Sequence, residues 1–103
     1  MKKSGVYEII LEQRVAGDFE TAFLFYEAIS PALSNNFTNL FELAVDKIKK
    51  KPYNYFNLTK KLRRITLGKF PYLIIYKISG EKVTVIGLFH QSSKSSSWRT
   101  PKN

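Results

Sequence analysis

The clearest structural pattern of this sequence lies in residues 62–90, LRRITLGKFPYLIIYKISGEKVTVIGLFH. The stretch contains three runs rich in β-branched and aromatic residues, separated by short turns at Gly68 and Gly80. The runs span Leu62–Leu67, Pro71–Ile78 and Lys82–His90. Short glycine-containing turns join neighbouring antiparallel strands, so the stretch predicts a three-stranded antiparallel meander.

Side chains of a strand alternate between the two faces of a sheet, and this alternation assigns the residues of the stretch. Arg63 and Arg64 are expected on opposite faces. In the last run, one face is predicted to carry Val83, Val85, Gly87 and Phe89, and the other Thr84, Ile86, Leu88 and His90.

The first half of the chain predicts one strand and two helices. Val6–Leu11 has the composition of a strand. Asp18 suits the N-cap of a first helix, which Pro31 ends because proline breaks the helical hydrogen-bond ladder. Ser34-Asn35-Asn36 supplies caps for a second helix that stops before Pro52. We expect the apolar stripes of both helices to pack on the sheet, with four phenylalanines lining the core: Phe19, Phe23, Phe37 and Phe41.

The predicted element order is β-α-α-β-β-β, which is typical of an α+β domain. We expect a helical hairpin packed on one face of a small antiparallel sheet, with the first strand beside a later one. One domain is expected over residues 1–103, because this length supports one hydrophobic core. The segment 91–103 is rich in Ser and Lys, so we expect it to be partly mobile, with Trp98 packed back on the domain.

The composition argues against several classes of enzyme. There is no Cys and only one His, so no metal-ligand set is expected. The glycines are isolated and no serine lies on a nucleophile elbow, so neither a phosphate-binding loop nor a serine hydrolase is expected. We expect no cofactor.

The apolar runs are shorter than a membrane span and the lack of Cys favours a reducing compartment, so we expect a cytoplasmic protein without membrane contact.

Charge is distributed unevenly along the chain. Residues 1–46 hold 3 Lys/Arg against 7 Asp/Glu, a net charge of −4, whereas residues 47–103 hold 14 against 1, a net charge of +13. A half this basic is expected to bind a polyanion or an acidic partner, with strong dependence on salt. The alternative is that its lysines serve solubility alone, although charges for that purpose are normally mixed in sign.

The candidate functional residues lie in the basic half. Arginine suits phosphate or carboxylate groups, because its guanidinium donates two parallel hydrogen bonds. For Arg63 the alternative is a structural pair with a carboxylate of the helices. The aromatic residues Phe70, Tyr72 and Tyr76 form either a stacking surface for bases or part of the core. His90 is either a proton carrier or a side chain that fixes the C-terminal segment.

These residues, in this order, resemble the RelE/ParE superfamily, the toxins of type II toxin–antitoxin pairs. The resemblance covers the chain from about Val6 to Trp98. Its N-terminal part rests on Tyr7, Asp18, Ala22, Phe25-Tyr26-Glu27, Leu33, Phe37, Ile48 and Pro52. Its most specific part comprises Arg64, Phe70-Pro71-Tyr72, Tyr76, His90 and Trp98. The fold of this superfamily is the same β-α-α-β-β-β arrangement.

The Phe-Pro-Tyr turn and the spacing from His90 to Trp98 look more like the ParE branch, the plasmid stabilisation type. That branch is associated with blocking DNA gyrase, so the resemblance implies a gyrase inhibitor that is silenced by a cognate antitoxin. ParE-like chains often carry Arg and Pro where this chain has Ser93 and Ser95. The alternative within the superfamily is a RelE-like, metal-independent endoribonuclease acting on ribosome-bound mRNA. In that case Arg64 would stabilise the scissile phosphate and His90 would move a proton.

A third reading is a non-toxic nucleic-acid-binding module. In the toxin readings, the antitoxin is expected to present an acidic segment that is partly disordered alone. Enzyme activity stays open, because no complete set of acid, base and charge-stabilising groups is evident, and so does homo-oligomerisation. The residues expected to contact the target or the antitoxin are Lys60, Lys61, Arg63, Arg64, Lys69, Tyr72, Lys94 and Trp98.

Overall fold

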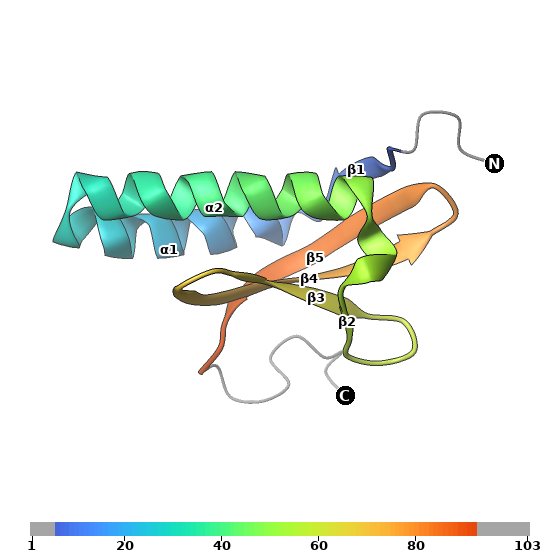
Figure 1. The fold of residues 1–103 in the computed structure, drawn as a ribbon. Coiled ribbons are helices and arrows are strands. Elements are labelled where there is room, and N and C mark those ends of the chain that lie inside the picture. The colour runs from blue at the N-terminus through green and yellow to red at the C-terminus, as the bar shows by residue number, and fades with distance from the viewer. Residues whose placement is uncertain (1–5, 93–103) are drawn as a thin grey trace.

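The computed structural model describes residues 6–92 (Figure 1). The elements are β1 (Glu8–Leu11), α1 (Arg14–Ile29), α2 (Pro31–Lys50), the 3-10 helix η1 (Pro52–Asn54), β2 (Phe56–Asn57), β3 (Arg63–Leu67), β4 (Phe70–Ser79) and β5 (Lys82–His90). The predicted order is confirmed, with η1 and the short β2 added between α2 and β3. The turns after β3 and β4 contain Gly68 and Gly80 at φ of 60° and 61°, a conformation that favours glycine.

The five strands form one sheet in the order β1-β5-β4-β3-β2. The strands from β2 to β5 are antiparallel neighbours, but β1 runs parallel to β5, so the sheet is mixed rather than antiparallel throughout. A parallel pair needs a long connection between its strands. The helical hairpin and the other strands, which lie between β1 and β5 in the chain, provide that connection.

The two helices lie side by side over one face of the sheet, with α1 against β5 and α2 against β3 (Figure 1). The far end of the hairpin extends past the sheet. The core between helices and sheet includes completely buried side chains from α2, β4 and β5: Phe37, Ile48, Ile74, Tyr76, Val83 and Val85. The α+β fold expected from the sequence is therefore confirmed.

The phenylalanines of the hairpin form one ring cluster. Phe37 is completely buried, and the ring of Phe19 lies 5.5 Å from it and 4.9 Å from the ring of Phe41. Phe19 and Phe41 are half-buried and pack against the core. Phe23 stacks on Phe19 at 5.9 Å but stays half-buried outside the core cluster. The core prediction therefore holds for three of the four rings, and Phe23 borders the core.

The helix α1 begins at Arg14, so the prediction that Asp18 caps it is wrong. Asp18 lies in the second turn, where Arg14 donates two hydrogen bonds to its carboxylate, at 2.8 and 3.1 Å. The carboxylate also accepts a bond from the backbone N–H of Leu88, at 3.1 Å. β1 pairs with β5 only as far as Val85, so Asp18 supplies an acceptor where the edge of β5 has no neighbouring strand. At Gly87 a Cβ would lie 3.1 Å from this carboxylate, so the absence of a side chain permits the approach.

The second helix begins earlier than its predicted caps. Ser30 is the N-cap and its Oγ accepts a bond from the N–H of Leu33, at 3.1 Å, while Pro31 takes the first helical position. Pro31 thus ends α1 as expected and also starts α2. Ser34 is buried inside the helix, where its hydroxyl donates to the Glu27 carboxylate and to the Pro31 carbonyl. Ser34 therefore links the two helices and is not a cap.

The register between β4 and β5 shifts between Ile75 and Tyr76, which leaves Ile86 as an extra residue on β5. Such a bulge reverses the face to which the following side chains point. Leu88 therefore lies in the core with Val85, and the two faces predicted for β5 are wrong from Gly87 onward.

Candidate functional site

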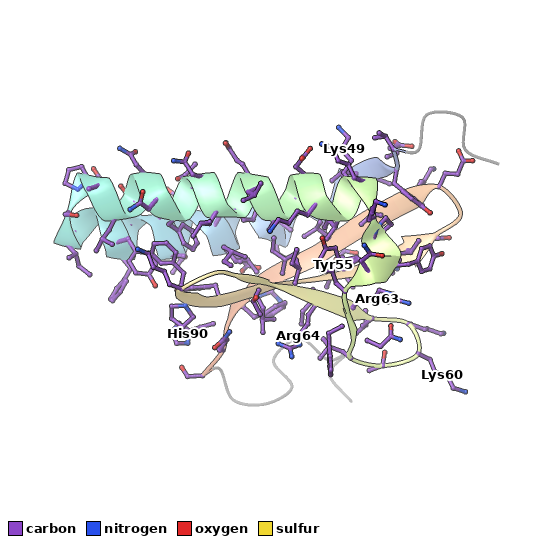
Figure 2. All side chains as sticks on the ribbon, viewed as in Figure 1. Lys49, Tyr55, Lys60, Arg63, Arg64 and His90 are labelled. Carbon is purple, nitrogen blue, oxygen red and sulfur yellow. The ribbon has the colours of Figure 1, made fainter. Side chains whose placement is uncertain are left out.

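The predicted functional residues within the described part of the chain fall into three separate places. Figure 2 shows Arg63 and Lys60 at the end of the sheet that carries η1, Arg64 on the side turned away from the helices, and His90 at the other end. Lys69 is exposed in the β3–β4 turn. Lys94 and Trp98 lie outside the described residues.

Arg63 has a structural role, but its partners are not carboxylates. Its Nη1 donates to the backbone carbonyls of Tyr53, at 3.2 Å, and Tyr55, at 2.8 Å. Its guanidinium also lies over the Tyr53 ring, 5.1 Å from the ring centre. Arg63 therefore holds the segment around η1 against β3, and the expected alternative of a pair with a helix carboxylate is wrong.

Tyr76 fixes the same segment from inside the core. Its hydroxyl donates to the Pro52 carbonyl at 2.6 Å, and its side chain is completely buried. Burial raises the pKa of this hydroxyl well above its usual value. Phe70 is also buried, so the core reading is confirmed for both residues.

Next to Arg63 the surface forms a depression that we call the basic hollow. It is lined by Tyr53, Lys60, Lys61, Arg63, Lys77, Ile78 and Ser79. The hydroxyl of Thr59 accepts bonds from the N–H groups of Lys61 and Leu62, both at 3.0 Å, which orders the loop between β2 and β3. Sequence reasoning missed Lys77 and Tyr53. Lys77 directly follows the buried Tyr76 in the strand. Because side chains alternate between the two faces of a sheet, this position could have identified Lys77 as an outward-facing cation.

Arg64 points to the other side of β3, as alternation predicts. It is in register with Phe56 of β2 and Ile75 of β4, and its guanidinium lies 4.4 Å from the centre of the Phe56 ring. A second depression, along the exposed edge of β3, is lined by Lys47, Tyr55, Phe56, Arg64, Ile65, Thr66 and Gly68. Arg64 is thus a partly exposed cation supported by an exposed ring, free of the backbone contacts that hold Arg63.

His90 and Tyr72 form a pair at the opposite end of the sheet. Their rings meet edge to face with centres 5.0 Å apart, and Tyr72 also contacts Tyr26 and Phe37. Burial, and then the nearby Tyr26, raise the pKa of the Tyr72 hydroxyl. The Nδ1 atom of His90 accepts a bond from the N–H of Ser92 at 3.0 Å, so a neutral ring carries its proton on Nε2. Tyr72 is therefore part of the aromatic packing, and His90 fixes the turn after β5, which is the structural alternative.

Arg64 and His90, the two candidates for ribonuclease chemistry, do not converge. Arg64 is in register with Ile75 and His90 with Tyr72, on opposite neighbours of β4. The two positions differ by three residues along the strands and by two strand spacings across the sheet. Their backbones are therefore about 14 Å apart. His90 contacts Tyr72, which packs against the helices, whereas Arg64 points away from the helices. The side chains of Arg64 and His90 therefore do not reach one phosphate in this arrangement.

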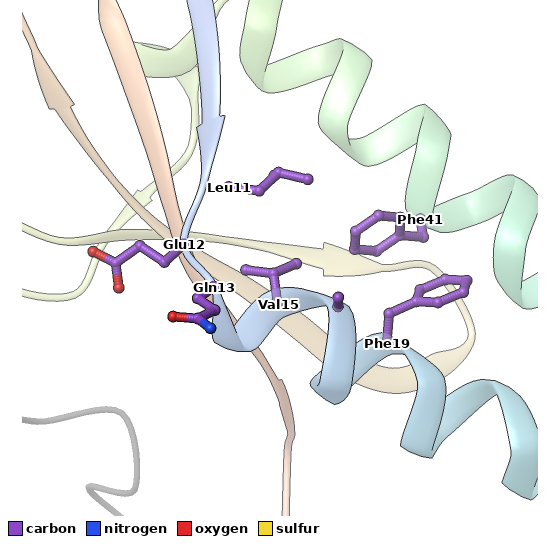
Figure 3. Close-up of a pocket in the computed structure, with 7 residues that line it drawn as sticks. Leu11, Glu12, Gln13, Val15, Phe19 and Phe41 are labelled. Carbon is purple, nitrogen blue, oxygen red and sulfur yellow. The ribbon is translucent and has the colours of Figure 1, made fainter.

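An apolar groove, which the sequence did not reveal, lies between β1 and the helical hairpin. We call it the β1 groove, and Figure 3 shows its inner part, lined by Leu11, Glu12, Gln13, Val15, Ala16, Phe19 and Phe41. It continues past Leu11 and Phe41 to Ile9 and Val45, where its side is lined by Glu42, Asp46 and one cation, Lys49. Its floor is hydrophobic and several of its rim groups are acidic, so its chemistry is unlike that of the basic hollow.

Two further classes of site are absent from residues 6–92. No helix in this part of the chain is long and apolar enough to cross a membrane. No group of three or more His, Asp or Glu side chains in the same part is placed to hold a metal ion.

Comparison with known proteins identifies the family. The solved structure of the chromosomal ParDE toxin–antitoxin system from P. aeruginosa contains a chain that superposes with a TM-score of 0.72 at 13% identity, covering 84% of this chain and 98% of that one. A mutant of the E. coli toxin RelE in the free state superposes with a TM-score of 0.61 at 12% identity, covering 86% and 87%. Similarity at this level of identity shows the fold alone.

No curated protein matches the sequence. The family model for the ParE toxin of the type II toxin–antitoxin system parDE, however, matches residues 9–94, which is most of the chain. This chain therefore belongs to the ParE toxin family of type II toxin–antitoxin systems.

Proposed function

We propose that the protein is a toxin that inhibits DNA gyrase in the cytoplasm by direct binding and is neutralised by a cognate antitoxin. Membership of the ParE toxin family supports the toxin role and implies an antitoxin partner. The choice of gyrase rests on the resemblance to the ParE branch. Binding, rather than bond cleavage, is the mode of action that the arrangement of side chains favours.

The separation of Arg64 from His90 is the observation that carries this choice. A ribonuclease needs a proton carrier and a charge-stabilising group around one scissile phosphate. His90 instead lies against Tyr72 and binds the Ser92 backbone, about 14 Å from Arg64 along the sheet. The similarity to RelE is one of fold and adds nothing for cleavage.

Arg64 is our candidate for contact with the target. It is partly exposed and its guanidinium makes no hydrogen bond within residues 6–92, and the Phe56 ring beside it is 59% exposed. An arginine next to an exposed aromatic ring is a common centre of protein–protein interfaces. Lys69 and Tyr72 are less suited, because Lys69 lies at the far hairpin turn and Tyr72 is packed among rings.

The antitoxin is proposed to bring an acidic segment that folds on binding. The net charge of +13 over residues 47–103 favours such a partner electrostatically. The edges of the sheet at β1 and β2 offer unpaired backbone groups for an added strand. Because acidic residues line the side of the β1 groove, an acidic segment is favoured on the basic half instead.

The target is tested by running one preparation of the protein against two purified systems. We expect inhibition of DNA supercoiling by gyrase and intact mRNA on ribosomes. Arg64→Ala should weaken the inhibition, whereas Lys49→Ala, a matched removal of a positive charge on α2, should leave it within about twofold. Full inhibition by Arg64→Ala would remove this residue from the interface.

The antitoxin is tested by expressing the chain together with its neighbouring gene and purifying through a tag on either product. We expect a stable complex in which the partner is protected from proteolysis only when bound. Recovery of the toxin alone, freely soluble, from cells that express both genes would contradict the proposal.

A further inference from the structure

We propose that the basic hollow binds the phosphate backbone of double-stranded DNA. Four of its seven lining residues are cations, and none carries a carboxylate. Lys60, Lys61, Lys77 and Arg63 also form no ion pair within residues 6–92. Cations left without counter-charges around one depression are suited to a ligand that carries several negative charges.

The cations of the hollow come from three parts of the chain, and the backbone that carries each of them is held in place. Two backbone carbonyls hold the guanidinium of Arg63. Tyr53, whose ring lies under this guanidinium, belongs to η1, and the Tyr76 hydroxyl holds η1 in place by donating to the Pro52 carbonyl. Thr59 orders the loop that carries Lys60. Lys77 stands on β4, a central strand of the sheet. Such an arrangement binds an anion with little loss of backbone freedom.

The shape of this end favours a duplex over a single strand. A single strand is normally bound by several aromatic rings on which successive bases stack. The lining of the hollow contains one ring, Tyr53, which already contacts Arg63 and the edge of Tyr7. The loop with Lys60 projects away from the body of the protein, so its charge can approach phosphates without a clash with the sheet (Figure 2). Contacts of this kind position a protein on DNA without reading its sequence.

The hollow shares no lining residue with the depression that contains Arg64, so this proposal does not depend on gyrase being the target. DNA binding can be measured without gyrase. A protein that binds DNA at the hollow and fails to inhibit gyrase would refute the proposed function alone, and the reverse result would refute this inference alone.

The test is the affinity for a short labelled DNA duplex, by fluorescence anisotropy between about 50 and 200 mM salt. We expect Lys60→Ala/Lys77→Ala to bind about tenfold more weakly at the lower salt. The slope of log K against log salt should become shallower by about 2. Each phosphate contact contributes about −0.9 to this slope, and the double variant loses two such contacts. Lys60→Arg/Lys77→Arg should restore both quantities.

The control is Lys49→Ala/Lys50→Ala, which removes the same charge from the end of α2. We expect its slope to match that of the unmodified protein. Equal weakening by both double variants would show that only net charge matters and would overturn the proposal, as would an unchanged slope in Lys60→Ala/Lys77→Ala. Tighter binding of single-stranded RNA than of the duplex would also overturn it. Thermal unfolding of each variant checks that the fold is intact.

Discussion

The two ends of the sheet use similar residues for different purposes. At the end with η1, the backbone and Tyr76 hold Arg63 and Tyr53 in place, and lysines remain exposed around them. At the other end, Tyr72 packs against the rings of Tyr26 and Phe37, and His90 binds the backbone of the turn after β5. Basic and aromatic residues therefore indicate a binding surface only where their side chains are not already used by the fold.

The largest expected effect is on stability at the aromatic end. Phe37 is completely buried and contacts the rings of Tyr26, Phe70 and Tyr72. Phe37→Ala should lower the free energy of unfolding by about 3–5 kcal/mol, measured by chemical denaturation. Phe25, 60% exposed, is the matched control, and its truncation should cost less than about 1 kcal/mol. A comparable loss in both variants would mean that this end is not packed as described.

The next effect concerns the bond between α1 and the edge of β5. Asp18→Ala removes the acceptor of the Leu88 N–H and the partner of Arg14, and should cost about 1.5–3 kcal/mol. Asp46→Ala breaks only an exposed pair with Lys50 and should cost about 0–1 kcal/mol. If the two losses measured by denaturation are equal, Asp18 does not serve the sheet edge.

A smaller difference separates the two neighbouring arginines. Arg63→Ala removes hydrogen bonds to two carbonyls and should cost about 1–2 kcal/mol, at the low end for charged donors because the site is partly exposed. Arg64→Ala removes a ring contact and should cost about 0.5–1 kcal/mol. Gyrase inhibition should show the opposite ranking once both variants are compared at equal folded concentration. A larger loss of stability for Arg64→Ala would reverse their assigned roles.

The smallest effect appears only at alkaline pH. Burial raises the pKa of the Tyr76 hydroxyl above its usual value of 10.0, so the unfolded chain releases this proton first. The contribution of Tyr76 to stability is complete below pH 10 and decreases as the pH rises above it. The free energy of unfolding of Tyr76→Phe should decrease less steeply above pH 10 than that of the unmodified protein. This variant also loses the hydrogen bond to Pro52 at every pH. The same alkaline slope in both proteins would exclude Tyr76 as its source.

Most of the fold could be predicted from the sequence because its signals are local. The strands and turns of residues 62–90 follow from composition and from glycine at the two turns. Pro31 marked the boundary between the helices correctly. Asp18 was misplaced because a good capping residue also suits any site that needs a carboxylate. That the Leu88 N–H needs such an acceptor is visible only once β1 is seen to end at Leu11.

The site was less predictable, because it depends on contacts between distant segments. The bulge at Ile86 has no clear sequence signal, yet it places Leu88 in the core. The partners of Arg63 are backbone carbonyls, which every residue possesses and no motif marks. The basic hollow was predicted in part, since Lys60, Lys61 and Arg63 are close in sequence, while Lys77 joins them only through the pairing of β3 with β4.

His90→Ala is the variant that best separates a toxin that acts by binding its target from one that acts by cutting RNA. The variant should be checked for folding by circular dichroism, since His90 fixes the turn after β5. We predict that it inhibits gyrase supercoiling with the same concentration dependence as the unmodified protein, and that neither protein cuts ribosome-bound mRNA. Site-specific cuts made by the unmodified protein and lost in His90→Ala, with gyrase activity unaffected by both, would show that the protein is a ribonuclease and not a gyrase inhibitor.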